Sequence, residues 1–563
     1  MIKTEVYGRI AFPLPVGAVR AEILAPNGSA GTSQAGISLP SGRVEAVPVF
    51  KRQPVKFSYD YHGYETAGPD GGPVLEARYT ARAAGRHELR AYDSGGAEVA
   101  RIEFEAVDAG LPGYVVVSEE DPRYFALSCG GGYVPIGLNM VGCGYDRLPA
   151  GRDHFAASQQ TATTGLIQWK RWFAELKAAG ANYCRIWLSN RYTQARTELM
   201  GVHDLIALER YDAVMELARA AGVRVKLCLE HWRTFSDAPH FAYKRYVDPD
   251  TGLQLMDENE WFLSEKWNER WLSDIAPYIE RYHDDPVVFA WELWNEIDCG
   301  KGSFEAVTAF TKRMLPRVKA LSPHNLVVNS LGSFDEEWKQ ERQDMFRDMP
   351  EMDFQQVHRY LDQGAPMEIC HGDPVAFSIE AVERSRRPDK PCILTETGAV
   401  NDRHVGPFRF YTNDHGGQIF HDVTYPALFA GAAGSGHIWH WGEYVEAKNL
   451  FRHFAPLAKA FEGVAAHKEG FEASVIPCDR AWILLLKGKT VALAYVRSKA
   501  DRWDYVLRDA AAPAPITDFS VPVKCASAEA HWIMDEAPGG VEVKDGKVAF
   551  PAFTHGCVLK MYL

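Results

Sequence analysis

The stretch VVFAWELWNE (287–296) determines how the central part of this chain is interpreted. It begins as an unbroken apolar run, which is typical of a strand buried on both faces of a parallel sheet. It ends on Asn-Glu, so a polar pair stands where the strand stops. Seven further runs of this strand-like kind follow one another along the chain: VPIGLNM (134–140), NYCRIWL (182–188), VRVKLCLE (223–230), NLVVNSLG (325–332), FQQVHRY (354–360), CILTETG (392–398) and GHIWHW (436–441).

Helical patterns fill the intervals between these runs. WKRWFAELKAAG (169–180) repeats its apolar residues every three or four positions and ends on Gly180, and YDAVMELARAAG (211–222) ends on Gly222 in the same way. Eight strand–helix repeats predict a TIM (β/α)8 barrel over residues 109–465. The structural alternative is a doubly wound sheet, but no GxGxxG or GxxxxGK[ST] motif follows any of the strands.

The sequence pattern differs at both ends of the chain, where short runs of alternating apolar residues are separated by Gly, Pro, Asn and Asp. Residues 1–108 contain VRAEILAP and VLEARYTARAAGRHELRAYD, which predict an N-terminal, immunoglobulin-like β-sandwich. Residues 466–563 contain AWILLLKG and TVALAYVRS, which predict a second, C-terminal β-sandwich. The expected fold class is therefore α/β, with a barrel between two sandwiches.

Composition excludes several classes of function. The 563 residues are 46% hydrophobic and 24% charged, and 61 Lys+Arg against 74 Asp+Glu give a net charge of −13. An acidic chain without a basic run is a poor ligand for nucleic acid or for an anionic membrane, and no stretch is long and apolar enough to cross a bilayer.

Localisation is also an expectation from sequence. The N-terminus, MIKTEVYGRI, has no signal-peptide pattern, and the ten cysteines include no CxxC pair, so we expect a cytoplasmic protein with reduced thiols. No cofactor is expected, and a homo-oligomer is left open.

The candidate site residues stand at the carboxyl ends of the predicted strands, where barrels of this kind build their sites. Such a collection of polar and aromatic groups is costly in a core and expected in a site. The candidates, in chain order, are Arg185, Glu230, His231, Asn295, Glu296, His358, Tyr360, Glu396, Trp439 and Trp441. Asn139, at the end of the first strand, is interpreted as mainly structural.

Two carboxylates, Glu296 and Glu396, lie three strands apart and are expected to face each other across the central hollow. Glycoside hydrolysis needs two such groups, one protonated and one ionised. Arg185 and Tyr360 are the expected partners of Glu396. The apolar sequence neighbours of Glu296 are expected to raise its pKa, with His358 as its hydrogen-bond partner.

Together these residues resemble clan A of the retaining glycoside hydrolases, and most closely glycoside hydrolase family 5, the cellulase-like family. The resemblance rests on Trp-Asn-Glu after the fourth strand, His-x-Tyr at the sixth, Thr-Glu at the seventh, an Arg on the second and a Trp on the eighth. It implies an acid/base role for Glu296, a nucleophile role for Glu396 and binding of the sugar 2-hydroxyl by Asn295. It further implies that Trp439 lies under the reacting sugar.

The remaining family positions are matched less uniformly. Arg185, His358 and Tyr360 match residues around the two carboxylates, and His231, preceded by Glu230, stands where the family has a histidine after the third strand. The family commonly reads Asn-Glu-Pro, whereas Ile297 stands here.

Other chemistries fit the sequence less well. His437 and His440 are three apart on a strand and point to opposite faces, so they do not form a metal site together. No G-x-S-x-G motif supports a serine hydrolase.

We therefore expect retaining hydrolysis of a β-glycosidic bond through a covalent intermediate on Glu396, with an oligosaccharide or glycoside as the substrate. Three long loops, 141–165, 232–258 and 399–418, could close the site into a pocket, which favours exo-action. The alternatives are a clan A enzyme of another family (a β-galactosidase, β-mannosidase, β-xylosidase or furanosidase), a transglycosylase and a catalytically inactive carbohydrate-binding barrel.

Overall fold

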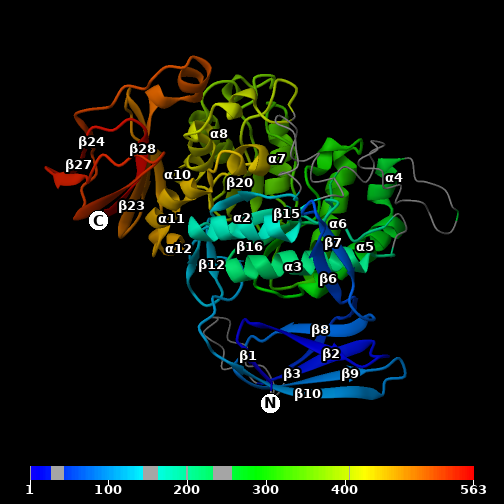
Figure 1. Ribbon diagram of the computed structural model, residues 1–563. Coiled ribbons are helices and arrows are strands. Elements are labelled where there is room, and N and C mark those ends of the chain that lie inside the picture. The colour runs from blue at the N-terminus through cyan, green and yellow to red at the C-terminus, as the bar shows by residue number, and fades with distance from the viewer. Residues whose placement is uncertain are drawn as a thin grey trace.

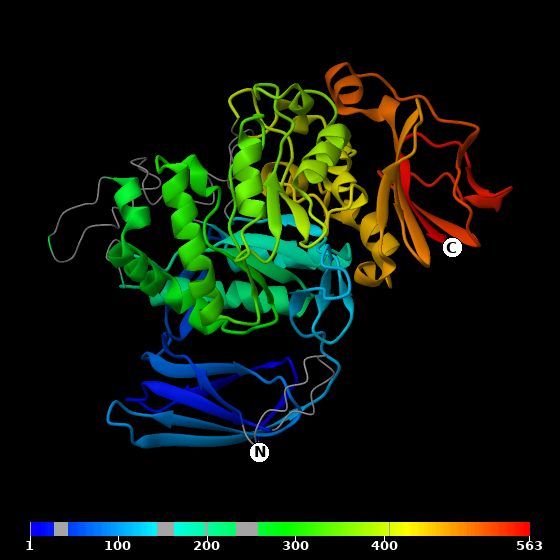
Figure 2. The ribbon, with the colours of Figure 1, turned by 180° about the vertical axis from the view of Figure 1, so that it is seen from behind.

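The computed structural model describes residues 2–26, 43–143, 163–197, 201–231, 251, 257–404 and 406–563, and the account below is limited to them. Two of the three predicted long loops, 141–165 and 232–258, fall largely outside this range. Six aromatic or histidine residues expected in the second of these loops are outside it as well: Trp232, Phe235, His240, Phe241, Tyr243 and Tyr246. A central α/β region lies between two β-modules, one near each chain terminus (Figures 1 and 2).

Parallel strands form the centre of the α/β region. Five of them make one parallel ladder in chain order, and two make a second. The first ladder consists of β14 (Gly137–Asn139), β15 (Tyr183–Trp187), β16 (Arg224–Cys228), β17 (Val288–Glu292) and β18 (Leu326–Val328), and the second of β19 (Gln355–His358) and β20 (Cys392–Glu396). Every residue of these seven strands is buried, as expected for strands covered on both faces.

Backbone hydrogen bonds continue the strand order beyond the two ladders. Asp353 N donates to Val327 O at 3.1 Å, next to the gap between β18 and β19. Ile438 forms a parallel bridge with Thr397 after β20, and its carbonyl accepts from Asn139 N at 3.0 Å, which leads back to β14. The predicted eighth strand, 436–441, was therefore wrong as a full strand. It makes one bridge because the chain turns at Trp441 into the π-helix η7 (Trp441–Glu446).

Helices connect the strands and cover them. They are α2 (Leu166–Ala178), α3 (Leu205–Ala221), α4 (Glu258–Leu263), α5 (Glu265–Arg281), α6 (Phe304–Leu321), α7 (Lys339–Arg347), α8 (Pro374–Ser385), α9 (Gln418–Thr424), α10 (Pro426–Phe429), α11 (Ala455–Phe461) and α12 (Ala466–Glu469). Gly222 ends α3 with φ +75°, as predicted. At the start of this helix the Asp204 side chain accepts from two backbone N–H groups, a cap that the sequence analysis did not identify.

The N-terminal β-module has its own core between two sheets. One sheet contains β1 (Ile2–Glu5), β10 (Glu98–Val107), β9 (Gly85–Tyr92), β3 (Arg20–Ala25) and β4 (Arg43–Val47), and the other contains β2 (Arg9–Leu14), β8 (Val74–Thr80) and β5 (Val49–Arg52). A hairpin of β6 (Val55–Tyr59) and β7 (Glu65–Pro69) leaves this module and reaches the central region (Figure 1).

The C-terminal β-module shares its core with the central region. Its larger sheet contains β21 (Glu472–Val475), β22 (Ala481–Lys487), β23 (Val491–Ser498), β28 (Gly556–Tyr562) and β25 (Ser527–Trp532), and its smaller sheet contains β24 (Phe519–Val521), β27 (Lys547–Phe550) and β26 (Glu542–Lys544). Leu493 and Tyr495 of β23 join the central core, whereas Ala492 and Ala494 face a second core inside the module. Strand β23 of the larger sheet is thus buried on both faces.

A small antiparallel sheet of β11 (Val115–Val117), β12 (Phe125–Leu127) and β13 (Gly132–Tyr133) precedes β14. Among the described residues, we find no helix with the length and apolar character needed to traverse a lipid bilayer.

Candidate active site

The two predicted carboxylates come from strand ends that meet at one edge of the parallel sheet. Glu396 is the last residue of β20. Glu296 stands four residues beyond the end of β17, in the left-handed region with φ +48°, and its N–H donates to Ser330 Oγ at 3.0 Å. A non-glycine residue rarely adopts this conformation, and such residues are concentrated at functional sites. This hydrogen bond to Ser330 Oγ holds the turn that carries the Glu296 side chain.

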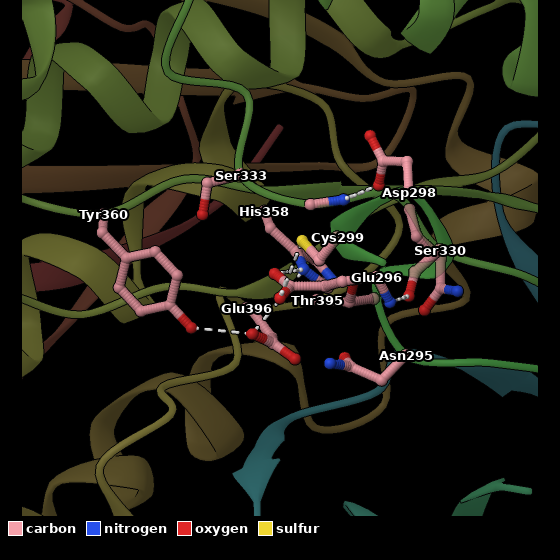
Figure 3. Close-up of polar contacts among 12 residues, drawn as sticks. Asn295, Glu296, Asp298, Cys299, Ser330, Ser333, His358, Tyr360, Thr395 and Glu396 are labelled. Atoms are coloured by element: carbon pink, nitrogen blue, oxygen red, sulfur yellow. Dashed lines mark hydrogen bonds and ion pairs between the residues drawn. The ribbon is translucent and has the colours of Figure 1, made fainter. Parts of the chain in front are cut away.

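Glu296 and Glu396 lie on either side of His358 (Figure 3). Nδ1 of His358 is 2.9 Å from Glu296 Oε1 and 3.6 Å from Glu396 Oε2. One atom from each of the three side chains lies within 4.8 Å of the other two. Carboxyl groups this close fit the retaining arrangement, with a separation of about 5–5.5 Å, better than the inverting arrangement, in which a wider separation leaves room for a water molecule.

Glu396 is held by two donors. Nη1 of Arg185 donates to its Oε1. The Tyr360 hydroxyl donates to its Oε2 at 2.8 Å (Figure 3). The side chain of Glu396 is only 4% exposed, so its negative charge depends on these partners. Both donors fix the direction in which the carboxylate oxygens point.

Glu296 has the opposite surroundings. Burial raises the pKa of its carboxyl, and the neighbouring charge of Glu396 raises it further, while the contact with His358 opposes both effects. Its side chain remains 19% exposed, so a ligand can reach it. A carboxyl group of this kind carries a proton at higher pH than an ordinary glutamate, which suits a proton donor.

A second buried carboxylate, Glu292 in β17, was missed by the sequence analysis. Nε and Nη2 of Arg185 donate to its two oxygens at 2.6 and 2.9 Å, and Lys226 Nζ lies 3.4 Å from it. The signal was present in the sequence, because a charged residue inside a buried apolar strand needs a partner. The interpretation of VVFAWELWNE as an apolar run did not make use of it.

Asn295 and the two tryptophans also lie around the carboxylates. Asn295 Oδ1 accepts from Arg185 Nη2 at 2.7 Å. Trp439 is partly exposed, and its ring lies 5.2 Å from that of Trp187 and 5.5 Å from that of Trp441. Trp441 is fully buried and donates from Nε1 to a backbone carbonyl, so it supports Trp439 from behind. Trp439, unlike Trp441, keeps part of its ring exposed and available to a ligand.

His231 and Glu230 occupy a neighbouring, fully buried position. His231 Nδ1 lies 2.6 Å from Ser189 Oγ, and its ring packs 4.8 Å from Trp187. Glu230 forms an ion pair of 2.7 Å with Arg196. Through the ring of Trp187, His231 is linked to Trp439.

Two groups of side chains in the described residues have the composition of a cation site. The first is Glu296, His358 and Glu396, where the guanidinium of Arg185 on Glu396 opposes the binding of a further positive charge. The second is Asp335, Asp362 and His404, where Lys339 already pairs with Asp335 at 2.5 Å. In both groups a neighbouring positive side chain therefore disfavours a bound metal ion.

Comparison with known proteins finds mannan endo-1,4-β-mannosidases among the sequence relatives of this chain. Mannan endo-1,4-β-mannosidase F of Aspergillus clavatus is 26% identical over 212 residues, which are 35% of this chain and 46% of the relative. Mannan endo-1,4-β-mannosidase 4 of Oryza sativa subsp. japonica is 30% identical over 175 residues, 29% of this chain and 37% of the relative. The chain thus spans less than half the length of these two relatives. No family model matches it.

A solved structure shares the fold. It is a Bacteroides vulgatus protein provisionally described as a glycoside hydrolase, with a TM-score of 0.56, 14% identity and coverage of 100% of both chains. At this identity the likeness concerns the fold alone. With the mannosidase relatives, the predicted resemblance is confirmed: the chain resembles the clan A, family 5-like glycoside hydrolases.

Proposed function

We propose that this protein is a retaining β-glycosidase in which Glu396 is the nucleophile and Glu296 the acid/base. The observation that carries the proposal is the pair itself: two carboxyl groups within 4.8 Å, one held by an arginine and a tyrosine and the other with a raised pKa. Retaining hydrolysis requires this separation and this difference in surroundings.

The proposed reaction has two displacements. In the first, a Glu396 oxygen attacks the anomeric carbon, the glycosidic bond breaks, and the Glu296 proton passes to the departing oxygen. In the second, Glu296, now ionised, takes a proton from water as that water attacks the anomeric carbon and releases Glu396. His358, 2.9 Å from Glu296, keeps the acid/base directed at the bond during both steps.

We further propose a β-1,4-linked mannoside as the substrate, because the curated relatives are named mannan endo-1,4-β-mannosidases. Exo-action, expected from the long loops, receives no support from these names, and two of the loops lie outside the described residues. We therefore place endo-action first. Trp439, partly exposed beside the carboxylates, is the proposed stacking surface for a sugar.

A (β/α)8 barrel between two β-sandwiches is the architecture we propose for this site. The order of the seven strands and the bridge at Ile438 support it, and so does the shared fold of the Bacteroides vulgatus protein. In such a barrel the carboxyl ends of all the strands lie at one face, which accounts for the convergence of Arg185, Glu296 and Glu396.

The proposal is tested with Glu396→Ala on β-1,4-manno-oligosaccharides and on an activated aryl β-mannoside. We expect the variant to fold and to lose turnover at least about 1,000-fold, and azide to restore part of the rate on the aryl mannoside as an α-mannosyl azide. Chromatography of products from mannohexaose separates endo- from exo-action and reveals transglycosylation.

Full activity of the Glu396→Ala variant would refute the nucleophile assignment. Saturable binding of manno-oligosaccharides by the wild-type protein without any turnover would favour a carbohydrate-binding protein instead.

A further inference from the structure

The proposed nucleophile, Glu396, belongs to a buried group of four charges. Arg185, Lys226 and Glu292 have side chains with no exposed surface, and Glu396 is nearly covered. The strand register explains the grouping, because Arg185 of β15 pairs with Lys226 of β16, and Cys228 of β16 pairs with Glu292 of β17. Two positive and two negative side chains therefore meet inside the sheet.

Arg185 connects the two carboxylates. It grips Glu292 with Nε and Nη2, and only Nη1 is left for Glu396 and for Asn139 Oδ1 at 3.3 Å. A guanidinium held by two parallel hydrogen bonds cannot rotate, so the position of Nη1 under Glu396 is determined by Glu292.

Lys226 completes the arrangement from the other side. Its Nζ lies 3.4 Å from Glu292 Oε2 and donates to Gln356 Oε1, while Gln356 Nε2 donates to Glu292 Oε1 at 3.1 Å. Burial lowers the pKa of Lys226 to about 8, although Glu292 opposes the effect. Without Lys226, Arg185 alone would face two carboxylates in a region without water, which is strongly unfavourable.

We infer that Glu292 and Lys226 are positioning residues for the nucleophile: Glu292 fixes Arg185, and Lys226 balances the charge of Glu292. This inference rests on the proposed function of Glu396. When the sugar ester forms, Glu396 loses its charge while Arg185 keeps Glu292 as its partner. The guanidinium is then never left buried and unpaired, so forming the ester does not require the site to rearrange.

The two residues have opposite electrostatic effects on Glu396, and this makes the inference testable. Glu292→Gln leaves two cations facing one carboxylate, so the acidic limb of kcat/KM should move to lower pH, by about one unit. Lys226→Met leaves two carboxylates facing one cation, so the same limb should move to higher pH by a similar amount. The double variant restores the balance, and its limb should return toward that of the wild type.

Other charged or titratable groups face Glu396 or its charged partners and stay unchanged in these variants. Those that interact with Glu396 itself are Glu296, His358, Tyr360 and Cys299. Those that interact with Arg185, Lys226 or Glu292 are Cys228, Tyr183 and His437. Because they are common to all variants, they cannot produce shifts of opposite sign.

The matched control is Glu209→Gln. Glu209 is also buried and pairs with two arginines, Arg281 at 3.1 Å and Arg52 at 2.8 Å, but it lies at the contact with the N-terminal module. We expect this variant to lower the unfolding temperature without moving either pH limb. Lys226→Arg and Glu292→Asp keep the charge and should retain the wild-type acidic limb, which serves as the readout if a neutral variant does not fold.

Opposite shifts in the two single variants support the inference. The inference is overturned if the acidic limb stays in place in both single variants while activity or stability falls. It is also overturned if the acidic limb moves in the same direction in both. A wild-type protein without glycosidase activity overturns the proposed function instead, so the two failures are distinguishable.

Discussion

Glu296 is the residue whose surroundings most directly control the proposed reaction. Burial and the charge of Glu396 raise its pKa, so it holds its proton to higher pH than an ordinary glutamate and loses it as pH rises further. Wild-type kcat/KM should therefore fall on the alkaline side. In Glu296→Gln this alkaline limb should disappear and the rate on unactivated mannosides should drop by about 100- to 10,000-fold, measured as a pH profile.

An aryl mannoside with a good leaving group is the control for Glu296→Gln, because it needs no protonation to depart. The first displacement should be nearly intact with this substrate, with a burst of aryl alcohol before the slow second step. An unchanged alkaline limb on unactivated mannosides would remove Glu296 from the acid role.

Trp439 offers the partly exposed ring beside the carboxylates. Trp439→Ala should lower kcat/KM about 10- to 100-fold, since covering an aromatic side chain with a ligand is worth about 1.5–3 kcal/mol. Trp338→Ala is the matched control, because Trp338 is 53% exposed, lies at the start of the outer helix α7 and donates to Glu336. Equal rates for Trp439→Ala and the wild type would show that the ring is only packing.

At the scale of the element, the turn after β17 depends on the strand beside it. Ser330, two residues past the end of β18, accepts from Glu296 N at 3.0 Å and donates to Trp294 O at 3.2 Å. Ser330→Ala leaves these groups unpaired, which costs about 1–3 kcal/mol, and should lower kcat/KM about 10-fold by loosening Glu296.

Two variants test whether this effect belongs to the turn. Ser330→Thr keeps the hydroxyl and should retain most activity. Ser378→Ala removes a buried hydroxyl that donates to Pro374 O at 2.7 Å in α8, and it should cost stability but not activity. Full activity of Ser330→Ala at a reduced unfolding temperature would contradict the positioning role.

Strand ends could be predicted from sequence better than strand interiors. Parallel strands bring their carboxyl ends to one edge, so Arg185, His358 and Glu396 were expected together from their positions in the apolar runs, and the structure brings them together. Glu292 and Lys226 were missed because the same rule treats a buried run as uniformly apolar. The contact of Ser330 with Glu296 depends on how two strand ends face each other, which a single sequence does not reveal.

At the scale of the whole molecule, a buried ion cluster joins the C-terminal module to α9. Arg497 of β23 donates to Asp422 at 2.6 Å and also pairs with Asp501, so one arginine serves two carboxylates. Burial raises the pKa of Asp422 to about 7, with Arg497 opposing the effect. The folded protein therefore binds a proton here that the unfolded chain releases above its ordinary pKa of about 4.

The pH dependence of stability follows from this proton. The contribution of the Asp422 proton to the free energy of unfolding is fully present below about pH 4. It is lost as pH rises toward 7, by up to about 1.4 kcal/mol per pH unit. Asp422→Asn cannot ionise, so its unfolding temperature relative to the wild type should rise over that range and level off above it. Arg497→Met should destabilise at every pH. If the unfolding temperature of Asp422→Asn relative to the wild type instead falls as pH rises, Asp422 is ionised in the folded protein.

The hairpin of β6 and β7 connects the N-terminal module to the face that carries the site. Glu65, at the start of β7, is fully covered, and it accepts from Leu166 N, from the Tyr192 hydroxyl and from Arg210, which is 145 residues further along the chain. During synthesis the module can finish its sheets while this carboxylate still lacks every one of those partners. The last of these partners, Arg210, becomes available only when α3 has been synthesised, so we expect the first module to fold before it docks against the central region.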